Sequence, residues 1–141
     1  MEIEKLQKII VNALDDVKAQ NIVVYNTTHL TSEFERVVIA SGSSNRQTRA
    51  LAYNVAADVK AAGGDVLGVE GTDTGEWVLV DCGNAVVHVL QPNVREYYNL
   101  EEIWGDKVVT VEIEADQKNA AQERVKRTIG RRTVKIVNDT L

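Results

Sequence analysis

The sequence predicts an α/β protein in which one β-sheet of about five strands is flanked by helices. Three observations predict this fold class. The continuous apolar runs 22–25 and 37–40 are typical of strands that are covered on both faces, as in a sheet with helices packed against it. Two longer segments carry apolar residues at helical spacing. Alternating apolar residues on both sides of Gly83-Asn84 predict a β-hairpin.

The first helix is predicted over residues 3–20, because apolar residues recur there every three or four positions: Ile3, Leu6, Ile10, Ala13, Leu14 and Val17. A second helix begins at Ser44, where the Ser-x-x-Gln spacing to Gln47 matches a capping box. The predicted buried stripe of this helix comprises Leu51, Ala52, Val55, Ala56 and Val59. Gly63-Gly64 ends it, because glycine adopts the left-handed geometry of a helix C-terminus at no steric cost.

Residues 66–70 are predicted as a third strand, and 77–82 and 85–90 as the hairpin. A two-residue loop at Gly83-Asn84 determines the register of this hairpin. One face is then plain core: Val78, Val80, Cys82, Ala85, Val87 and Val89. The other face combines a large aromatic, a histidine and a carboxylate with apolar residues: Trp77, Leu79, Asp81, Val86, His88 and Leu90. Such a face suits contact with a partner, although a helix could also cover it.

Pro92 ends the hairpin, and residues 93–104 are predicted as one or two short helical turns. Apolar and polar residues alternate over 108–114, which predicts an extra strand. Beyond it we expect a basic helix of about 12 residues and then a short strand or a disordered end. The sequence therefore predicts a domain over 1–104 and a C-terminal extension over 105–141.

The net charge of −5 is unevenly distributed along the chain. Residues 116–141 hold seven basic and three acidic side chains, a net +4, whereas residues 1–115 hold nine basic and 18 acidic ones, a net −9. An acidic body repels nucleic acid phosphates and attracts basic protein surfaces, and a basic segment does the opposite. The extension could therefore contact a nucleic acid or be a solvated helix face.

Composition restricts where the protein works and what it can contain. Cys82 is the only cysteine, which excludes an intrachain disulfide and a multi-cysteine metal site. The N-terminus carries acids and no long apolar run, so no signal peptide is expected. No run of about 18 apolar residues occurs, so no membrane span is expected. These features predict a cytoplasmic protein.

Catalytic chemistry has weak support. Ser41-Gly42-Ser43-Ser44 lies between a strand and a helix, where backbone amides can hold a phosphate and where nucleotidyltransferases open their active site. Those enzymes need alternating carboxylates nearby to hold magnesium, and the pair Glu112 and Glu114 comes roughly 70 residues later. A helix cap is the better interpretation.

The remaining candidates also have ordinary explanations. His29 and His88 have no acid or cysteine at ligand spacing, so a structural or interface role is favoured over metal binding. Cys82 has no obvious partner for a nucleophilic role. Asp81 can bond the backbone of the turn at Gly83. The aromatic residues Tyr97, Tyr98 and Trp104 are interpreted as core rather than as stacking platforms for bases. We expect neither a cofactor nor enzymatic activity.

Four ordered segments of residues 3–104 resemble the ribosomal silencing factor (Iojap-like, RsfS) family. They read ALDDVKA at 13–19, VIASGSSNRQ at 38–47, VEG at 69–71 with EWVLVDCGNAVVHVL at 76–90, and REYYNLEEIW at 95–104. Two positions differ from the family pattern. Asn84 replaces an aspartate, which removes a charge, and Phe34-Glu35 replaces Thr-Asp, which removes a hydroxyl.

The resemblance implies a mixed β-sheet with flanking helices, related to the nucleotidyltransferase fold but without its catalytic acids. It also implies binding to the large ribosomal subunit through its fourteenth protein, uL14. The bound factor would sterically block joining with the small subunit and repress translation when nutrients are limited. Organellar relatives imply an alternative role in large-subunit assembly, and an RNA-binding module is a further alternative. From the family match and the hairpin register, the expected partner-binding residues are Glu70, Trp77, Leu79, Asp81, His88, Pro92, Glu96 and Tyr98. Whether the extension contacts rRNA, mediates a homodimer or has no partner is left open.

Overall fold

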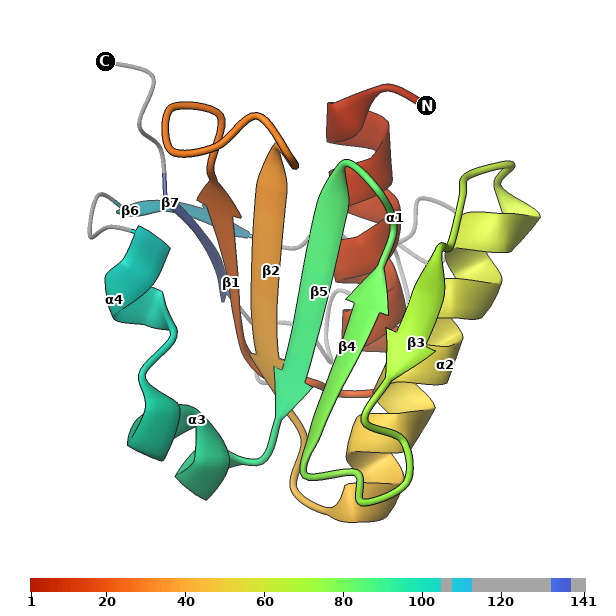
Figure 1. Cartoon of the computed structure of the whole chain (residues 1–141), viewed down its shortest axis with the longest axis vertical. Helices are drawn as coiled ribbons and strands as arrows, with labels where there is room; N and C mark the ends of the chain where they lie inside the picture. The colour runs from red at the N-terminus through yellow and green to blue at the C-terminus, as the bar shows by residue number, and fades with distance from the viewer. Residues whose placement is uncertain (105–107, 113–132, 138–141) are drawn as a thin grey trace, which may run out of the picture.

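The computed structural model describes residues 1–104, 108–112 and 133–137. A single seven-stranded sheet has the order β3-β4-β5-β2-β1-β7-β6 (Figure 1). The pairs β2–β5 and β1–β7 are parallel and the other pairs are antiparallel, which confirms a mixed sheet. The elements are α1 (Ile3–Asp16), β1 (Gln20–Asn26), β2 (Arg36–Ser41), α2 (Asn45–Ala61), β3 (Gly68–Glu70), β4 (Trp77–Asp81), β5 (Ala85–Leu90), α3 (Pro92–Tyr98), α4 (Glu101–Trp104), β6 (Val108–Glu112) and β7 (Thr133–Val137).

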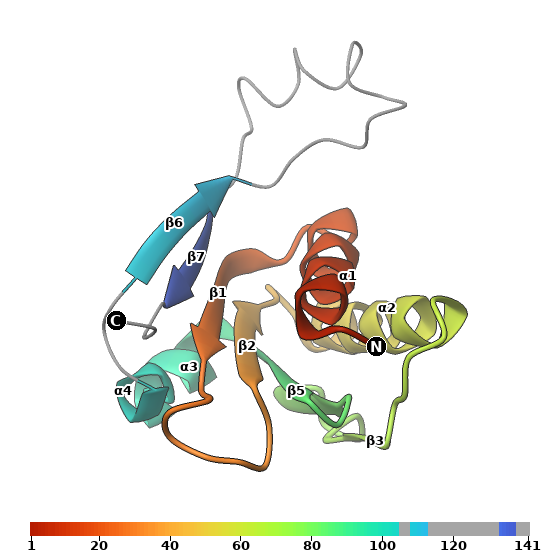
Figure 2. The ribbon, with the colours of Figure 1, turned by 90° about the horizontal axis from the view of Figure 1, so that it is seen from above.

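Helices cover both faces of the sheet (Figure 2). Helices α1 and α2 pack on one face, where the larger core contains Leu14, Val24, Val38, Leu51 and Val80. Helices α3 and α4 lie on the other face, over a smaller core that comprises Val23, Tyr25, Val37, Ile39 and Leu90. Consecutive residues of β1 and β2 therefore point into different cores, which confirms the prediction from their continuous apolar runs.

Helix α1 is shorter than predicted, because it ends at Asp16 rather than at residue 20. The chain then turns sharply into β1, with Lys18 at φ 62° and Asn21 at φ 51°. In this turn the amide of Lys18 bonds the carbonyl of Asp15 (2.9 Å) and that of Ala19 bonds Leu14 (3.0 Å). The apolar period continued past the helix end because Val17 and Ala19 pack against the same core from the turn.

Both ends of α2 follow the predicted chemistry. The Ser44 hydroxyl accepts the amide N–H of Gln47 (3.0 Å), so Ser44 caps the helix. The side-chain oxygen of Gln47 accepts the amide N–H of Ser43 (2.6 Å). In a standard capping box it would accept the amide of Ser44, so this bond is displaced by one residue. At the other end Gly63 has φ +88°, and its amide bonds the carbonyl of Lys60 (3.0 Å).

The hairpin has the predicted register. Trp77 lies opposite Leu90 and Val80 opposite Val87, and the amide of Cys82 bonds the carbonyl of Ala85 (2.9 Å) across the two-residue loop. The predicted core face is buried throughout. Strand β3 is shorter than the predicted 66–70. Strand β6 covers residues 108–112 of the predicted extra strand, and residues 113–114 lie outside the described residues. Strand β7 corresponds to the predicted final strand, whereas the predicted basic helix lies outside the described residues.

Candidate partner-binding surface

The second face of the sheet is only half covered by the described elements. A row of directly paired residues crosses it: Glu70 opposite Leu79, Leu79 opposite His88, and His88 opposite Ile39. Exposure decreases along this row. Glu70 is exposed, and Leu79 and His88 are half-buried. Ile39 is 0% exposed, in the smaller core that α3 and α4 cover. In Figure 1 no helix lies in front of β3 and β4. Helices therefore cover one half of this face. The other half, on β3, β4 and the His88 position of β5, faces outward and forms the open half of the sheet. Contact of this open half with a partner stays a prediction.

Trp77 is the centre of an aromatic cluster on the open half. Its indole Nε1–H donates to Nδ1 of His88 (3.1 Å), and the two ring centroids are 5.9 Å apart. The ring of Tyr98 also lies near Trp77, with ring centroids 5.1 Å apart and an interplanar angle of 49°. Tyr98 is 55% exposed, so the cluster reaches the surface. Aromatic residues held by several ring contacts lose little conformational freedom when a partner binds.

His88 is a neutral member of this cluster. Burial lowers the pKa of its imidazole to about 4. Because Nδ1 accepts the indole proton of Trp77, the proton of neutral His88 resides on Nε2. The imidazole therefore fixes the orientation of Trp77 without adding positive charge.

Three other predicted residues lie outside this cluster: Asp81, Pro92 and Glu96. Asp81 is at the far end of β4 from Trp77, about 13 Å away along an extended strand. Its carboxylate accepts the amide of Gly83 (2.9 Å), which is the turn-bonding role weighed above. Pro92 begins α3 and Glu96 follows one turn later, both exposed. The structure brings Trp77, His88 and Tyr98 together, whereas no hydrogen bond, ion pair or ring contact among the described residues joins Pro92 or Glu96 to them.

Acidic side chains lie around the open half. Glu70 is on β3, Asp81 is on β4, Glu76 directly precedes β4, and Glu96 is on the neighbouring helix α3. The lysines of residues 1–104 lie instead on α1, on α2 or in the turn after α1: Lys5, Lys8, Lys18 and Lys60. The open half therefore has the charge that attracts a basic protein surface and repels phosphate.

Comparison with known proteins identifies the family and supports the fold. The model of the family described as "Ribosomal silencing factor during starvation" matches residues 1–135. This chain belongs to the ribosomal silencing factor family. A ribosomal silencing factor from Chromobacterium violaceum is 50% identical over 105 residues, covering 74% of this chain and 86% of the relative. One from Bacillus subtilis is 36% identical over 106 residues, covering 75% and 90%. A crystal structure of a Chromobacterium violaceum protein, 48% identical, superposes with a TM-score of 0.74 over 76% of this chain and 89% of that chain.

Members of the ribosomal silencing factor family are named as regulatory factors and not as enzymes. The chemistry of the candidate catalytic positions agrees with that description. The Ser43 amide bonds the Gln47 side chain and Ser44 caps α2, which confirms the helix-cap interpretation. Burial, with a smaller contribution from the Asp81 carboxylate, raises the pKa of the Cys82 thiol to about 11, so little nucleophilic thiolate forms.

No helix in the described part of the chain is long and apolar enough to cross a membrane. No group of three or more His, Cys, Asp or Glu side chains in the same residues is placed to hold a metal ion.

The two departures from the ribosomal silencing factor pattern lie side by side. The carbonyl of Asn84 accepts the amides of Glu35 (2.7 Å) and Arg36 (3.1 Å), so the hairpin turn holds the loop before β2 through the main chain. These bonds do not depend on the Asn84 side chain, which is exposed. Phe34 packs edge-on against Trp104 of α4, with ring centroids 5.7 Å apart. Phe34 therefore provides an aromatic contact to α4.

Sequence reasoning was wrong about two tyrosines and missed an arginine. Tyr97 is 81% exposed and contacts Tyr98 edge-on at 5.0 Å, so neither tyrosine is a core residue, whereas Trp104 is half-buried as expected. Arg95 is buried, although arginine is normally exposed. No local sequence signal identified it, because two of its acceptors, Asn21 and Ser41, are 74 and 54 residues away in the chain.

Proposed function

We propose that this chain acts in the cytoplasm as a ribosomal silencing factor that binds the large ribosomal subunit through uL14. The open half of the sheet is the proposed contact surface, with Trp77 and Tyr98 as anchors and with Leu79 and His88 beside them. The observation that carries this assignment is the Trp77 cluster on an uncovered, acidic face, in a chain that belongs to this family.

Silencing would follow from the position of the bound factor and would require no chemical step. A factor bound at the face that the small subunit must occupy excludes that subunit sterically. Joining of the subunits would then decrease as the occupancy of the large subunit rises, and translation would decrease when nutrients are limited. Affinity and orientation are therefore the properties that this surface must provide.

Charge and shape support a basic protein partner over RNA at this surface. Glu70, Asp81 and Glu96 would steer the face towards a basic protein and would repel the phosphate backbone. Buried aromatic anchors supply most of the affinity in protein interfaces, and Trp77 and Tyr98 are suited to that role because their rings already contact each other.

The test is sedimentation of purified ribosomal subunits through sucrose gradients with and without the protein. We expect the wild-type chain to sediment with free large subunits and to decrease the joined peak. Trp77→Ala or Tyr98→Ala should weaken binding by roughly 2 kcal/mol, a loss of about 30-fold.

The matched control is Tyr53→Ala, because Tyr53 on α2 is 54% exposed, nearly the same as Tyr98, but lies on the opposite layer. Tyr53→Ala should bind like wild type. Equal losses in Tyr53→Ala and Tyr98→Ala would contradict the proposed surface. A wild-type chain that remains at the top of the gradient while the subunits join would contradict the function.

A role in assembly of the large subunit is the second candidate. A mouse relative, 29% identical over 99 residues, is named "Mitochondrial assembly of ribosomal large subunit protein 1", and this chain covers 43% of its length. Depletion of an assembly factor would cause immature large subunits to accumulate in growing cells. Depletion of a factor that only silences would leave subunit maturation normal and increase joined ribosomes during starvation.

The basic segment 116–141 remains a separate proposal for contact with rRNA. Most of it lies outside the described residues, and its support is the net charge of +4. Removing it should decrease the salt dependence of ribosome binding if it neutralises phosphates. The predicted homodimer also stays a prediction, which analytical ultracentrifugation would test.

A further inference from the structure

Helix α3 is attached to the sheet in an unusual way. It has seven residues, Pro92–Tyr98, a length at which an isolated helix is unstable in water. Its buried residue is not apolar but charged: Arg95, which is 8% exposed. Arginine is rarely buried unless it is paired, and burial of its charge is costly unless every donor finds an acceptor.

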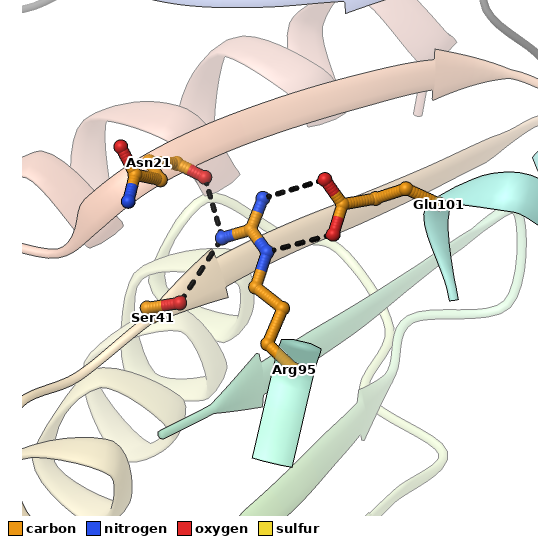
Figure 3. Close-up of polar contacts among 4 residues, drawn as sticks. All are labelled: Asn21, Ser41, Arg95 and Glu101. Atoms are coloured by element: carbon orange, nitrogen blue, oxygen red, sulfur yellow. Dashed lines mark hydrogen bonds and ion pairs between the residues drawn. The ribbon is translucent and has the colours of Figure 1, made fainter. Parts of the chain in front are cut away.

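The guanidinium of Arg95 joins three other elements (Figure 3). Its Nη1 donates to the carbonyl of Asn21 at the start of β1 (2.7 Å) and to the hydroxyl of Ser41 at the end of β2 (3.1 Å). Its Nε and Nη2 donate to the two carboxylate oxygens of Glu101 in α4 (2.9 and 3.3 Å). This is the bidentate geometry that arginine provides and lysine does not.

The same contacts determine where Tyr98 lies. Tyr98 is three residues after Arg95 on α3, and Asn99 then reverses the chain at φ 49° with its amide on the carbonyl of Arg95 (2.9 Å). The Arg95–Glu101 pair closes the six-residue step from α3 into α4 around this turn. Tyr98 is thus held between the anchored helix and the ring of Trp77.

We propose that Arg95 and Glu101 are positioning residues of the partner-binding surface, which hold α3 and α4 on the sheet so that Tyr98 stays against Trp77. This inference rests on the proposed function for its biological meaning. The position of Tyr98 can nevertheless be measured without a ribosome. The affinity for the large subunit then depends on two side chains that do not themselves touch the partner.

The test uses Arg95→Met, which keeps the aliphatic stem and removes the guanidinium, and Glu101→Gln, which removes the charge. Arg95→Lys is the conservative variant, and Glu102→Gln is the matched control because Glu102 is the exposed neighbour of Glu101 on α4. The first measurement is amide hydrogen exchange in the free protein. In Arg95→Met, the amides of Asn99 and Ile103 should exchange at least about tenfold faster, while amides of the β4–β5 hairpin keep their rates.

A second measurement reports the ring contact itself. The indole N–H resonance of Trp77, assigned with Trp77→Phe, should shift in Arg95→Met and Glu101→Gln as the Tyr98 ring moves away. Arg95→Lys should retain part of the wild-type exchange rates and shift, because a lysine ammonium reaches fewer of the acceptors. Glu102→Gln should match wild type in both measurements.

Binding to large subunits then separates positioning from general stability. If Arg95 acts by placing Tyr98, Arg95→Met should weaken binding about tenfold in the wild-type background and much less in a Tyr98→Ala background. Equal losses in both backgrounds would overturn the proposal, as would unchanged exchange and an unchanged Trp77 resonance in Arg95→Met. If wild type does not bind large subunits, the proposed function fails, whereas exchange and the Trp77 resonance still decide whether Arg95 places Tyr98.

Discussion

His88 should make the stability of the protein fall as the pH falls from neutral. In the folded chain its imidazole is half-buried against Trp77, which lowers its pKa to about 4 from an ordinary value of 6.5. Between these two values the unfolded chain binds a proton that the folded chain does not bind. Folding stability is therefore complete above about pH 6.5 and decreases as the pH falls towards 4. The full separation of the two pKa values corresponds to about 3 kcal/mol.

The assay is urea unfolding of wild type and His88→Gln, followed by tryptophan fluorescence, between about pH 7.5 and pH 4.5. Glutamine can still accept the indole N–H of Trp77 through its Oε1 but does not titrate in this range. Carboxylates contribute almost equally to both proteins and cancel in the comparison. The free energy of unfolding of wild type should therefore fall by about 2 to 3 kcal/mol more than that of His88→Gln. Parallel curves for the two proteins would refute the assignment of a depressed His88 pKa.

Three further predictions concern the elements that surround the site. Gly71→Ala should destabilise the loop before β4, because Gly71 has φ +89° and a Cβ there would clash with the carbonyl oxygen of Trp77. A thermal midpoint equal to that of wild type would contradict this expectation. Ser44→Ala should lower the free energy of unfolding by about 1 kcal/mol through loss of the cap on the Gln47 amide, and no change would show that the cap is dispensable. Cys82 should react with iodoacetamide far more slowly in the folded than in the unfolded protein, because burial raises the pKa of its thiol to about 11. Comparable rates in the two states would contradict this and would show that the end of β4 opens readily.

Some features of this protein were determined by short stretches of sequence. The loop at Gly83-Asn84 is two residues long, so every pair of the hairpin followed from it, including Leu79 opposite His88. Ser44 and Gly63 marked the two ends of α2, because capping is local chemistry between neighbouring residues. The apolar runs of β1 and β2 likewise predicted burial on both faces.

Other features were decided only by tertiary contacts. The end of α1 was one, since Val17 and Ala19 continue the apolar period while the chain has already turned towards β1. The burial of Arg95 was another, because its acceptors are contributed by elements as distant as Asn21, 74 residues away. Exposure of Tyr97 and Tyr98 followed from this arrangement, since α3 attaches through an arginine and its aromatic residues are left outside. Local periodicity describes which residues share a side of one element, whereas the choice of side that meets the sheet depends on partners far away in the chain.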